Sequence, residues 1–357
     1  MSELANRLEQ IEATGSHFEV GLAIGKRFAQ QIHQLFDNYR FLQRKVLPYH
    51  RTPEGQARYR AYLDLNRARY PDYLAELEGL AQGSGRPLEE LFLANLRGEY
   101  QVYLHTLRES HPEGCSDCSL LTDEVALIGH NEDGPPEFRG NMYVVHARIE
   151  GQPPFTALSY PGFLCGNAFG FNAEGICFSI DSLLPRDVRI GVGRYFTARS
   201  LLEARSLDDA IERVTVPGRA LGMNCTIGSV HERRIVSVEV SPQRHHIREV
   251  RGCYFHANHY LELTDVAQIM GPSSRARVRR ASQLLQDSPP VDGAGVLAIL
   301  GDQGDEQYPI YRTATPPDQN MTLYTALFDL DARLLRIYTG HPVLAPDEFI
   351  EFAMTPA

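Results

Sequence analysis

The chain has 357 residues and a formal net charge of −10, from 35 Lys and Arg against 45 Asp and Glu. Its 43% hydrophobic and 22% charged residues are typical of a globular protein with one large domain or two of ordinary size. The acidic balance argues against a nucleic-acid partner, and no apolar stretch is long enough to cross a membrane. The opening MSELANRLEQIEATG lacks the apolar centre of a signal peptide. We therefore expect a cytoplasmic protein whose six cysteines are thiols rather than disulfides.

The first third of the chain is patterned for helices. Apolar residues recur at mostly three-to-four spacing, which predicts helices over 20–49, 55–69, 71–85 and 86–104. Pro71 suits the first position of the third helix, and Gly79, Gly83 and Gly85 are interpreted as marking its end.

The pattern changes near residue 115. Short runs rich in β-forming residues follow, separated by turn residues: CSLL, VALIGHN, MYVVHARI, FTALSY, GICFSI, CTIGSV and RIVSVEV. Two helices are predicted over 197–214 and 273–287, and two strands around DLDAR close the chain within 321–340. A helical first third followed by many strands predicts an α+β fold in which helices cover the sheets.

The segment CSDCSLLTDEVALIGHNED predicts a β-hairpin. TDE at 122–124 is a good three-residue turn between two apolar runs. A hairpin centred on Asp123 places Cys115 opposite Asn131, with Asp133 just beyond that pair. Because directly opposed residues have Cβ atoms roughly 4.5–5.5 Å apart, we expect a thiol, an amide and a carboxylate to meet there.

Three interpretations of the two cysteines in HPEGCSDCSLL are open. A zinc site would combine Cys115 and Cys118 with His256 and His259, although the spacing of these histidines is shorter than usual. A redox pair would need a helix after the cysteines, whereas a strand and a turn follow. The third interpretation is an activated nucleophile.

A nucleophilic Cys115 needs a base, and no partner histidine is evident from the local sequence. A cysteine at a new N-terminus needs none, since its own α-amino group, with a pKa of about 7.7–8.0, can take the thiol proton. Gly114 fits a cut just before Cys115, because a residue without a side chain leaves its carbonyl open to attack. Arg275 or Arg279 in SSRARVRR is a further candidate, for binding a substrate carboxylate.

The sequence resembles the acyl-coenzyme A:6-aminopenicillanate acyltransferase (isopenicillin-N acyltransferase) family, within the N-terminal-nucleophile hydrolases. EGCSDCSLLTDEVALIGHNED resembles the cleavage site and first hairpin of the family, and FHANHY resembles its later Asn-bearing segment. Weaker similarities fall in the same order as in the family: GSHFEVGLAIGKRFAQQI, PDYLAELEGLAQGSG, LFLANLRGEY and GFNAEGICFSIDSL.

The resemblance implies a four-layer αββα sandwich and self-cleavage between Gly114 and Cys115. It implies a helical pro-segment over 1–114 and a chain over 115–357 that together form one compact domain, as a heterodimer of its own fragments. It implies no cofactor and a small linear amide as the substrate.

The site residues also follow from the resemblance. It makes Cys115 the nucleophile, Asn258 the oxyanion-hole residue and Asp133 the aspartate near the new amino terminus. Asn131 is the supporting residue that the hairpin pairing predicts. Glu132 stands where the family often has an aromatic residue, and this change suggests an altered charge at the pocket mouth.

Overall fold

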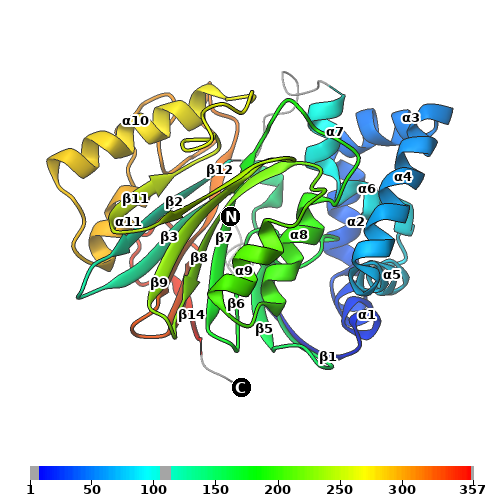
Figure 1. Ribbon diagram of the computed structural model, residues 1–357, viewed down its shortest axis with the longest axis horizontal. Helices are drawn as coiled ribbons and strands as arrows, with labels where there is room; N and C mark the ends of the chain where they lie inside the picture. The colour runs from blue at the N-terminus through cyan, green and yellow to red at the C-terminus, as the bar shows by residue number, and fades with distance from the viewer. Residues whose placement is uncertain (1–7, 105–113, 355–357) are drawn as a thin grey trace.

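The computed structural model describes residues 8–104 and 114–354, and it shows an α+β protein with two sheets (Figure 1). The helices of the first third are α1 (His17–Arg27), α2 (Ala29–Asn38), α3 (Leu47–His50), α4 (Pro53–Arg69), α5 (Pro71–Ser84), α6 (Leu88–Ala94) and α7 (Arg97–Tyr103), with a π-helical turn over Leu42–Val46. The α+β prediction is confirmed.

The larger sheet has eight strands in the order β1-β4-β5-β6-β7-β8-β9-β10. These strands are β1 (Glu9–Gly15), β4 (Tyr143–Ile149), β5 (Phe155–Ser159), β6 (Phe169–Asn172), β7 (Ile176–Leu183), β8 (Gly222–Ser229), β9 (Arg234–Val240) and β10 (His245–Glu249). All neighbours pair antiparallel except β1, which runs parallel to β4 at the edge. The sequence analysis missed β1, because only part of the polar segment that forms it is buried.

The smaller sheet has six antiparallel strands in the order β11-β2-β3-β12-β13-β14. They are β11 (Gly252–His256), β2 (Gly114–Leu121), β3 (Ala126–Gly134), β12 (Met321–Asp329), β13 (Leu334–Tyr338) and β14 (Phe349–Ala353). The predicted hairpin is therefore present as β2 and β3, at the centre of the molecule, with β11 and β12 on either side.

The two sheets pack face to face, with β2 against β7 and β9 and with β3 against β9. Outside them, α9 (Leu207–Val214) contacts β8 and β9, and α11 (Gly293–Leu300) contacts β2 and β3. The helices α8 (Arg194–Ser200) and α10 (Pro272–Asp287) lie beside α9 and β11 respectively (Figure 1). Helices thus contact the outer faces of both sheets.

Side chains of β2 alternate between two environments. Asp117 accepts a hydrogen bond from Ser179 of the facing sheet, whereas Cys118 packs with the apolar residues of α10 and α11. Odd-numbered residues of β2 therefore face the space between the sheets, and even-numbered residues face the helices. This alternation decides what each predicted site residue can reach.

The hairpin register differs from the prediction by one residue. The loop spans four residues, since the Thr122 amide donates to the Val125 carbonyl at 2.9 Å and strand pairing begins with Leu121 opposite Ala126. Cys115 consequently pairs with Glu132, and Asn131 pairs with Ser116. A one-residue slip turns every side chain to the other face of the sheet, so the predicted pairing of Cys115 with Asn131 is wrong.

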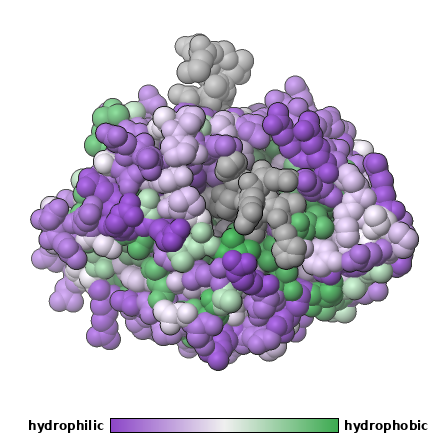
Figure 2. All heavy atoms as spheres, turned by 90° about the horizontal axis from the view of Figure 1, so that it is seen from above, coloured by the Kyte–Doolittle hydropathy of each residue, from purple (hydrophilic) through white to green (hydrophobic). Residues whose placement is uncertain are grey.

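Hydrophilic residues dominate the face seen from above in Figure 2, and a smaller group of hydrophobic residues lies near its middle. Among the described residues, no helix is both long enough and apolar enough to span a membrane.

Candidate active site

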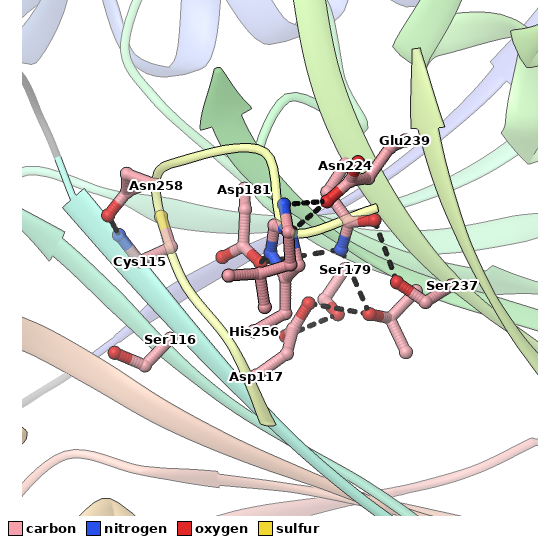
Figure 3. A network of polar contacts seen from close by, with 12 residues as sticks. Cys115, Ser116, Asp117, Ser179, Asp181, Asn224, Ser237, Glu239, His256 and Asn258 are labelled. Carbon is pink, nitrogen blue, oxygen red and sulfur yellow. Dashed lines mark hydrogen bonds and ion pairs between the residues drawn. The ribbon is translucent and has the colours of Figure 1, made fainter. Parts of the chain in front are cut away.

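The site is built around the first two residues of β2, Gly114 and Cys115, both of which are buried. The backbone N–H of Cys115 donates to Oδ1 of Asn258 at 2.9 Å, as Figure 3 shows. Asn258 follows directly after β11, the strand next to β2, so sheet pairing brings the two residues together across the sequence. The sequence analysis predicted Cys115 and Asn258 as site residues, and the fold places them in contact.

Gly114 lies where there is no room for a side chain. A Cβ atom at this position would collide with the Arg312 guanidinium and would lie 3.0 Å from Arg277 Nη2 and 3.1 Å from Asn258 Oδ1. A small pocket of about 40 Å³ opens beside it, and its lining includes Gly114, Ser182, Asn258, Ser274, Arg277 and Arg312. A volume of this size holds one or a few water molecules, and Gly114 forms part of its wall.

Arg277 is a site residue that the sequence analysis missed. Its guanidinium donates to the carbonyl of Cys115, to Ser116 Oγ at 2.7 Å and to Asn258 Oδ1 at 2.6 Å. Burial lowers its pKa, and the nearby charge of Arg312 acts in the same direction. The predicted candidates Arg275 and Arg279 are exposed on α10 and point away from this cluster.

A helical pattern could have identified Arg277. Ser274, Arg277 and Ala281 follow each other at three- and four-residue spacing, and all three are buried. That spacing marks one face of a helix, which here is the face toward the sheet.

Asp133, the next-to-last residue of β3, pairs with Gly114 and not with Cys115. Its Oδ1 accepts from Thr322 at 2.8 Å, and its Oδ2 lies 3.5 Å from Nη1 of Arg312. Burial raises the pKa of Asp133 to about 6, although Arg312 and Arg277 oppose the rise. The aspartate therefore reaches the Gly114–Cys115 bond through Arg312, which the sequence analysis also missed.

Asn131 does not support the thiol, contrary to the prediction. Its Nδ2 donates to the carbonyls of Leu300 at 2.8 Å and Ile310 at 3.3 Å, and its Oδ1 accepts from Thr325. The reason is the register, which turns Asn131 toward the helix layer and ties the end of α11 to the sheet.

Glu132, the cross-strand partner of Cys115, also differs from expectation. Its side chain is buried between the sheets rather than placed at a pocket mouth. Tyr160 donates to its Oε1, and its Oε2 lies 3.1 Å from Nε2 of His130. Nδ1 of His130 lies 2.7 Å from Oδ1 of Asp117. The histidine is thus fixed between two carboxylates beside the thiol.

A second histidine has the same surroundings. His256 ends β11, with Nδ1 2.7 Å from Asp181 Oδ2 and Nε2 3.1 Å from Glu239 Oε1 (Figure 3). Burial alone would lower the pKa of His256, but the hydrogen bonds and charges of Asp181 and Glu239 raise it to about 9. Glu239 also accepts from the amides of residues 261–263, so this unit holds the loop that carries Asn258.

The described structure does not assemble the predicted zinc ligands. Cys115 and Cys118 are three residues apart on a strand, so their side chains lie on opposite faces of the sheet. Cys118 Sγ lies 3.7 Å from Cys253 Sγ in the helix-facing core, and His259 is bonded to Ser274 at 2.6 Å. Cys118 is therefore a buried core cysteine of β2. A different set, Cys115, His130 and Glu132, has ligand-type atoms within 4.8 Å of one another. Both ring nitrogens of that histidine already have carboxylate partners.

Comparison with known proteins adds a family to this geometry. The model of the family described as acyl-coenzyme A:6-aminopenicillanic acid acyl-transferase matches residues 120–343, more than half of the chain. The chain belongs to this family. The predicted resemblance is therefore confirmed.

Two curated relatives extend the match. The β-alanyl-dopamine/carcinine hydrolase of Drosophila melanogaster is 28% identical, over 92% of each chain. The 40 kDa form of acyl-coenzyme A:6-aminopenicillanic-acid acyltransferase of Emericella nidulans is 26% identical over 80% of this chain and 79% of its own. Among solved structures, a Caenorhabditis elegans ortholog of N-acylethanolamine-hydrolyzing acid amidase matches with a TM-score of 0.43 and 10% identity, covering 67% of this chain and 99% of its own. A protein named as a hydrolase thus aligns with nearly all of this chain.

Proposed function

We infer that this member of the acyltransferase family is a self-processing cysteine amidohydrolase that cleaves a small linear amide through an acyl thioester on Cys115. The observation that carries the proposal is the position of Cys115 at the start of β2. Its backbone nitrogen contacts Asn258, and a pocket opens beside Gly114. Two stacked sheets with helices outside them support a four-layer αββα sandwich of the N-terminal-nucleophile type.

Cleavage of the Gly114–Cys115 bond would turn the Cys115 nitrogen into an amine. A terminal amine has a pKa of about 7.7–8.0 and can take the thiol proton, directly or through water, near neutral pH. The thiolate would then attack the carbonyl carbon of the substrate amide. The amine part leaves with the proton, and water hydrolyses the thioester.

The oxyanion of each tetrahedral intermediate needs hydrogen-bond donors. Nδ2 of Asn258 donates to the Ser182 carbonyl over a long 3.3 Å, and both residues line the pocket. This donor is therefore the one we assign to the oxyanion. Arg277 fixes the Asn258 amide by donating to its Oδ1, which keeps Nδ2 directed at the pocket wall.

A denaturing gel with intact mass measurement tests the processing step. Purified protein should give two pieces, residues 1–114 and 115–357, and Cys115→Ala should give one intact chain. Cys118→Ala is the matched control, since it removes a thiol from the same strand but from the opposite face. It should be processed like the wild type. A wild-type chain that stays uncut would contradict the proposed amine base.

The choice between hydrolysis and acyl transfer depends on what attacks the thioester, water or a second amine. The Drosophila relative is named as a hydrolase of β-alanyl-dopamine and carcinine, so β-alanyl amines are the first substrates to test. Processed enzyme would be incubated with an amide panel, with and without an acceptor amine, and analysed by mass spectrometry. Free acid as the product supports hydrolysis, and a new amide supports transfer.

A further inference from the structure

The uncut chain lacks the base that the mature enzyme would use. Before cleavage, the Cys115 nitrogen is a peptide amide that donates its proton to Asn258, so it cannot accept one from the thiol. Burial raises the pKa of the Cys115 thiol, which makes an acceptor for its proton still more necessary. Another group must therefore accept the thiol proton when the Gly114–Cys115 bond is cut.

Four other described residues of the site do not supply that base. Asp133 faces the helix layer with Thr322 and Arg312, on the side of the sheet opposite to the thiol. Arg277 and Arg312 are cations with no acceptor. His256 contacts Asp181 and Glu239, and it is not among the side chains whose atoms group with the Cys115 thiol.

His130 and Glu132 are placed differently. The Cys115 thiol, a ring nitrogen of His130 and a carboxylate oxygen of Glu132 all lie within 4.8 Å of one another. His130 and Glu132 alternate along β3, so both point into the space between the sheets, and Glu132 is directly opposite Cys115. No more than 5% of the Cys115, His130 or Glu132 surface is exposed, so bulk water does not surround the group.

The pair is also held rigidly. Asp117 fixes His130 through Nδ1, and Asp117 itself accepts from Ser179 and Thr226, each at 2.7 Å. Tyr160 donates to the far oxygen of Glu132, which leaves Oε2 for His130 and the thiol. Such outer partners are what a preorganised acid–base group requires.

We propose that the His130–Glu132 pair is the general base for self-cleavage of the uncut chain, with Asp117 as its positioning residue. The inference rests on the proposed function, because it assumes that the Gly114–Cys115 bond is cut by the Cys115 thiol. It assigns a catalytic use to Glu132, the cross-strand partner of Cys115.

Self-cleavage would pass through a thioester between Gly114 and the Cys115 side chain. The thiol proton of Cys115 passes to the pair, and Sγ forms a bond to the carbonyl carbon of Gly114. The bond from that carbon to the Cys115 nitrogen breaks, and the pair returns the proton to the departing nitrogen, which becomes an amine. Water then hydrolyses the thioester, which leaves a carboxylate on Gly114 and a free thiol on Cys115.

Glu132→Gln is the decisive variant, because it keeps the size of the side chain and an acceptor oxygen for Tyr160 but removes the basic carboxylate. The full chain would be made in a cell-free translation system with a short radioactive pulse, and cutting would be followed on denaturing gels. General-base catalysis typically contributes about 10²–10⁴-fold, so we expect cutting to slow by at least about 10²-fold. Glu132→Asp, which retains a carboxylate, should cut faster than Glu132→Gln.

Glu76→Gln is the matched control. It removes a buried carboxylate that lies 3.1 Å from a ring nitrogen of buried His17, the same distance as between Glu132 and His130, but it does so in α5, away from the thiol. It should lower the thermal midpoint, as Glu132→Gln does, and the chain should still cut. His130→Gln, measured in the same way, reports on the pair if Glu132→Gln does not fold.

The outcomes separate the two proposals. A wild-type chain that stays intact overturns the proposed function itself. A wild-type chain that is cut, together with folded Glu132→Gln that is cut at the same rate, overturns only the assignment of the base. Equal slowing in Glu132→Gln and Glu76→Gln also overturns it, because the effect would then follow from loss of any buried carboxylate.

Discussion

Single residues at this site divide according to the face of the strand on which they lie. Cys115 and Glu132 point between the sheets, whereas Asn131 and Asp133 point toward α10 and α11. The residue types and their nearness were predictable from the hairpin, but the faces were not. One extra residue in the loop turns each β3 side chain to the opposite face of the sheet from the one predicted. The sequence TDEV does not indicate that Val125 belongs to the turn rather than to the strand.

The two asparagines make this division testable. Asn258→Ala should lower kcat of the processed enzyme by about 10²–10³-fold, because one oxyanion donor is lost. Asn131→Ala should instead lower the free energy of unfolding by about 1–3 kcal/mol, since the carbonyls of Leu300 and Ile310 lose their partner. Steady-state kinetics and urea unfolding of both variants provide the measurement. A larger loss of kcat in Asn131→Ala than in Asn258→Ala would contradict the assignment.

At the scale of elements, the contact between α1 and α5 shows what the sequence pattern concealed. Gly79 and Gly83 do not end the third predicted helix; they lie inside α5, and only Gly85 is its cap, with φ of 74°. A Cβ at Gly79 would collide with the Phe18 carbonyl of α1, and one at Gly21 of α1 would collide with the Glu76 carbonyl. The glycines thus bring two backbones into contact, which no single-helix pattern reveals.

Gly79→Ala is expected to destabilise the protein. Alanine gains roughly 1 kcal/mol of helix propensity over glycine, but overpacking against a backbone carbonyl costs about 1–3 kcal/mol or more. The carbonyl belongs to a helix and cannot rotate away, so the loss should exceed the gain. Urea unfolding would measure the difference, with Gln82→Ala on the exposed side of α5 as control, expected within about 0.5 kcal/mol of the wild type. An equally stable Gly79→Ala would show that the helices can separate freely.

The end of β11 predicts a pH dependence. His256 has a pKa of about 9 in the folded chain against the ordinary histidine value of 6.5, because Asp181 and Glu239 face its two ring nitrogens and outweigh the effect of burial. A raised histidine pKa stabilises the fold fully below pH 6.5, and this stabilisation is lost as pH rises through 9. The contribution is on the order of 3 kcal/mol at about 1.4 kcal/mol per pH unit.

His256→Gln checks this contribution. Urea unfolding of wild type and variant at pH 6.5 and pH 9.5 gives two stability differences, and the difference at pH 9.5 should be smaller by roughly 3 kcal/mol. The same loop carries Asn258, so kcat of the wild type should fall together with stability above pH 9. Differences of equal size at both pH values would mean that His256 is neutral throughout.

Over the whole molecule, the described residues 8–104 are an integral part of the fold. The edge strand β1 pairs with β4, and the rings of Phe28 and Tyr143 stack with centroids 3.7 Å apart. Buried Arg199 binds Glu76 of α5 through Nη2 at 2.9 Å, and one hydrophobic core contains residues of both parts. A change of sequence pattern near residue 115 predicted a boundary there, but it could not reveal that a sheet and a core extend across that position.

The two pieces should therefore stay together after cleavage. Native mass spectrometry of processed protein should give one species with the mass of the whole chain plus one water, and denaturing conditions should give residues 1–114 and 115–357 separately. Removing the first piece would expose an edge of β4, an apolar core surface and the charge of Arg199. The free-energy cost of exposing these groups to water should far exceed what the two pieces gain by moving apart. Unfolding followed by circular dichroism should show a single transition. Loss of the first piece during gel filtration in native buffer would contradict the shared core as the basis of assembly.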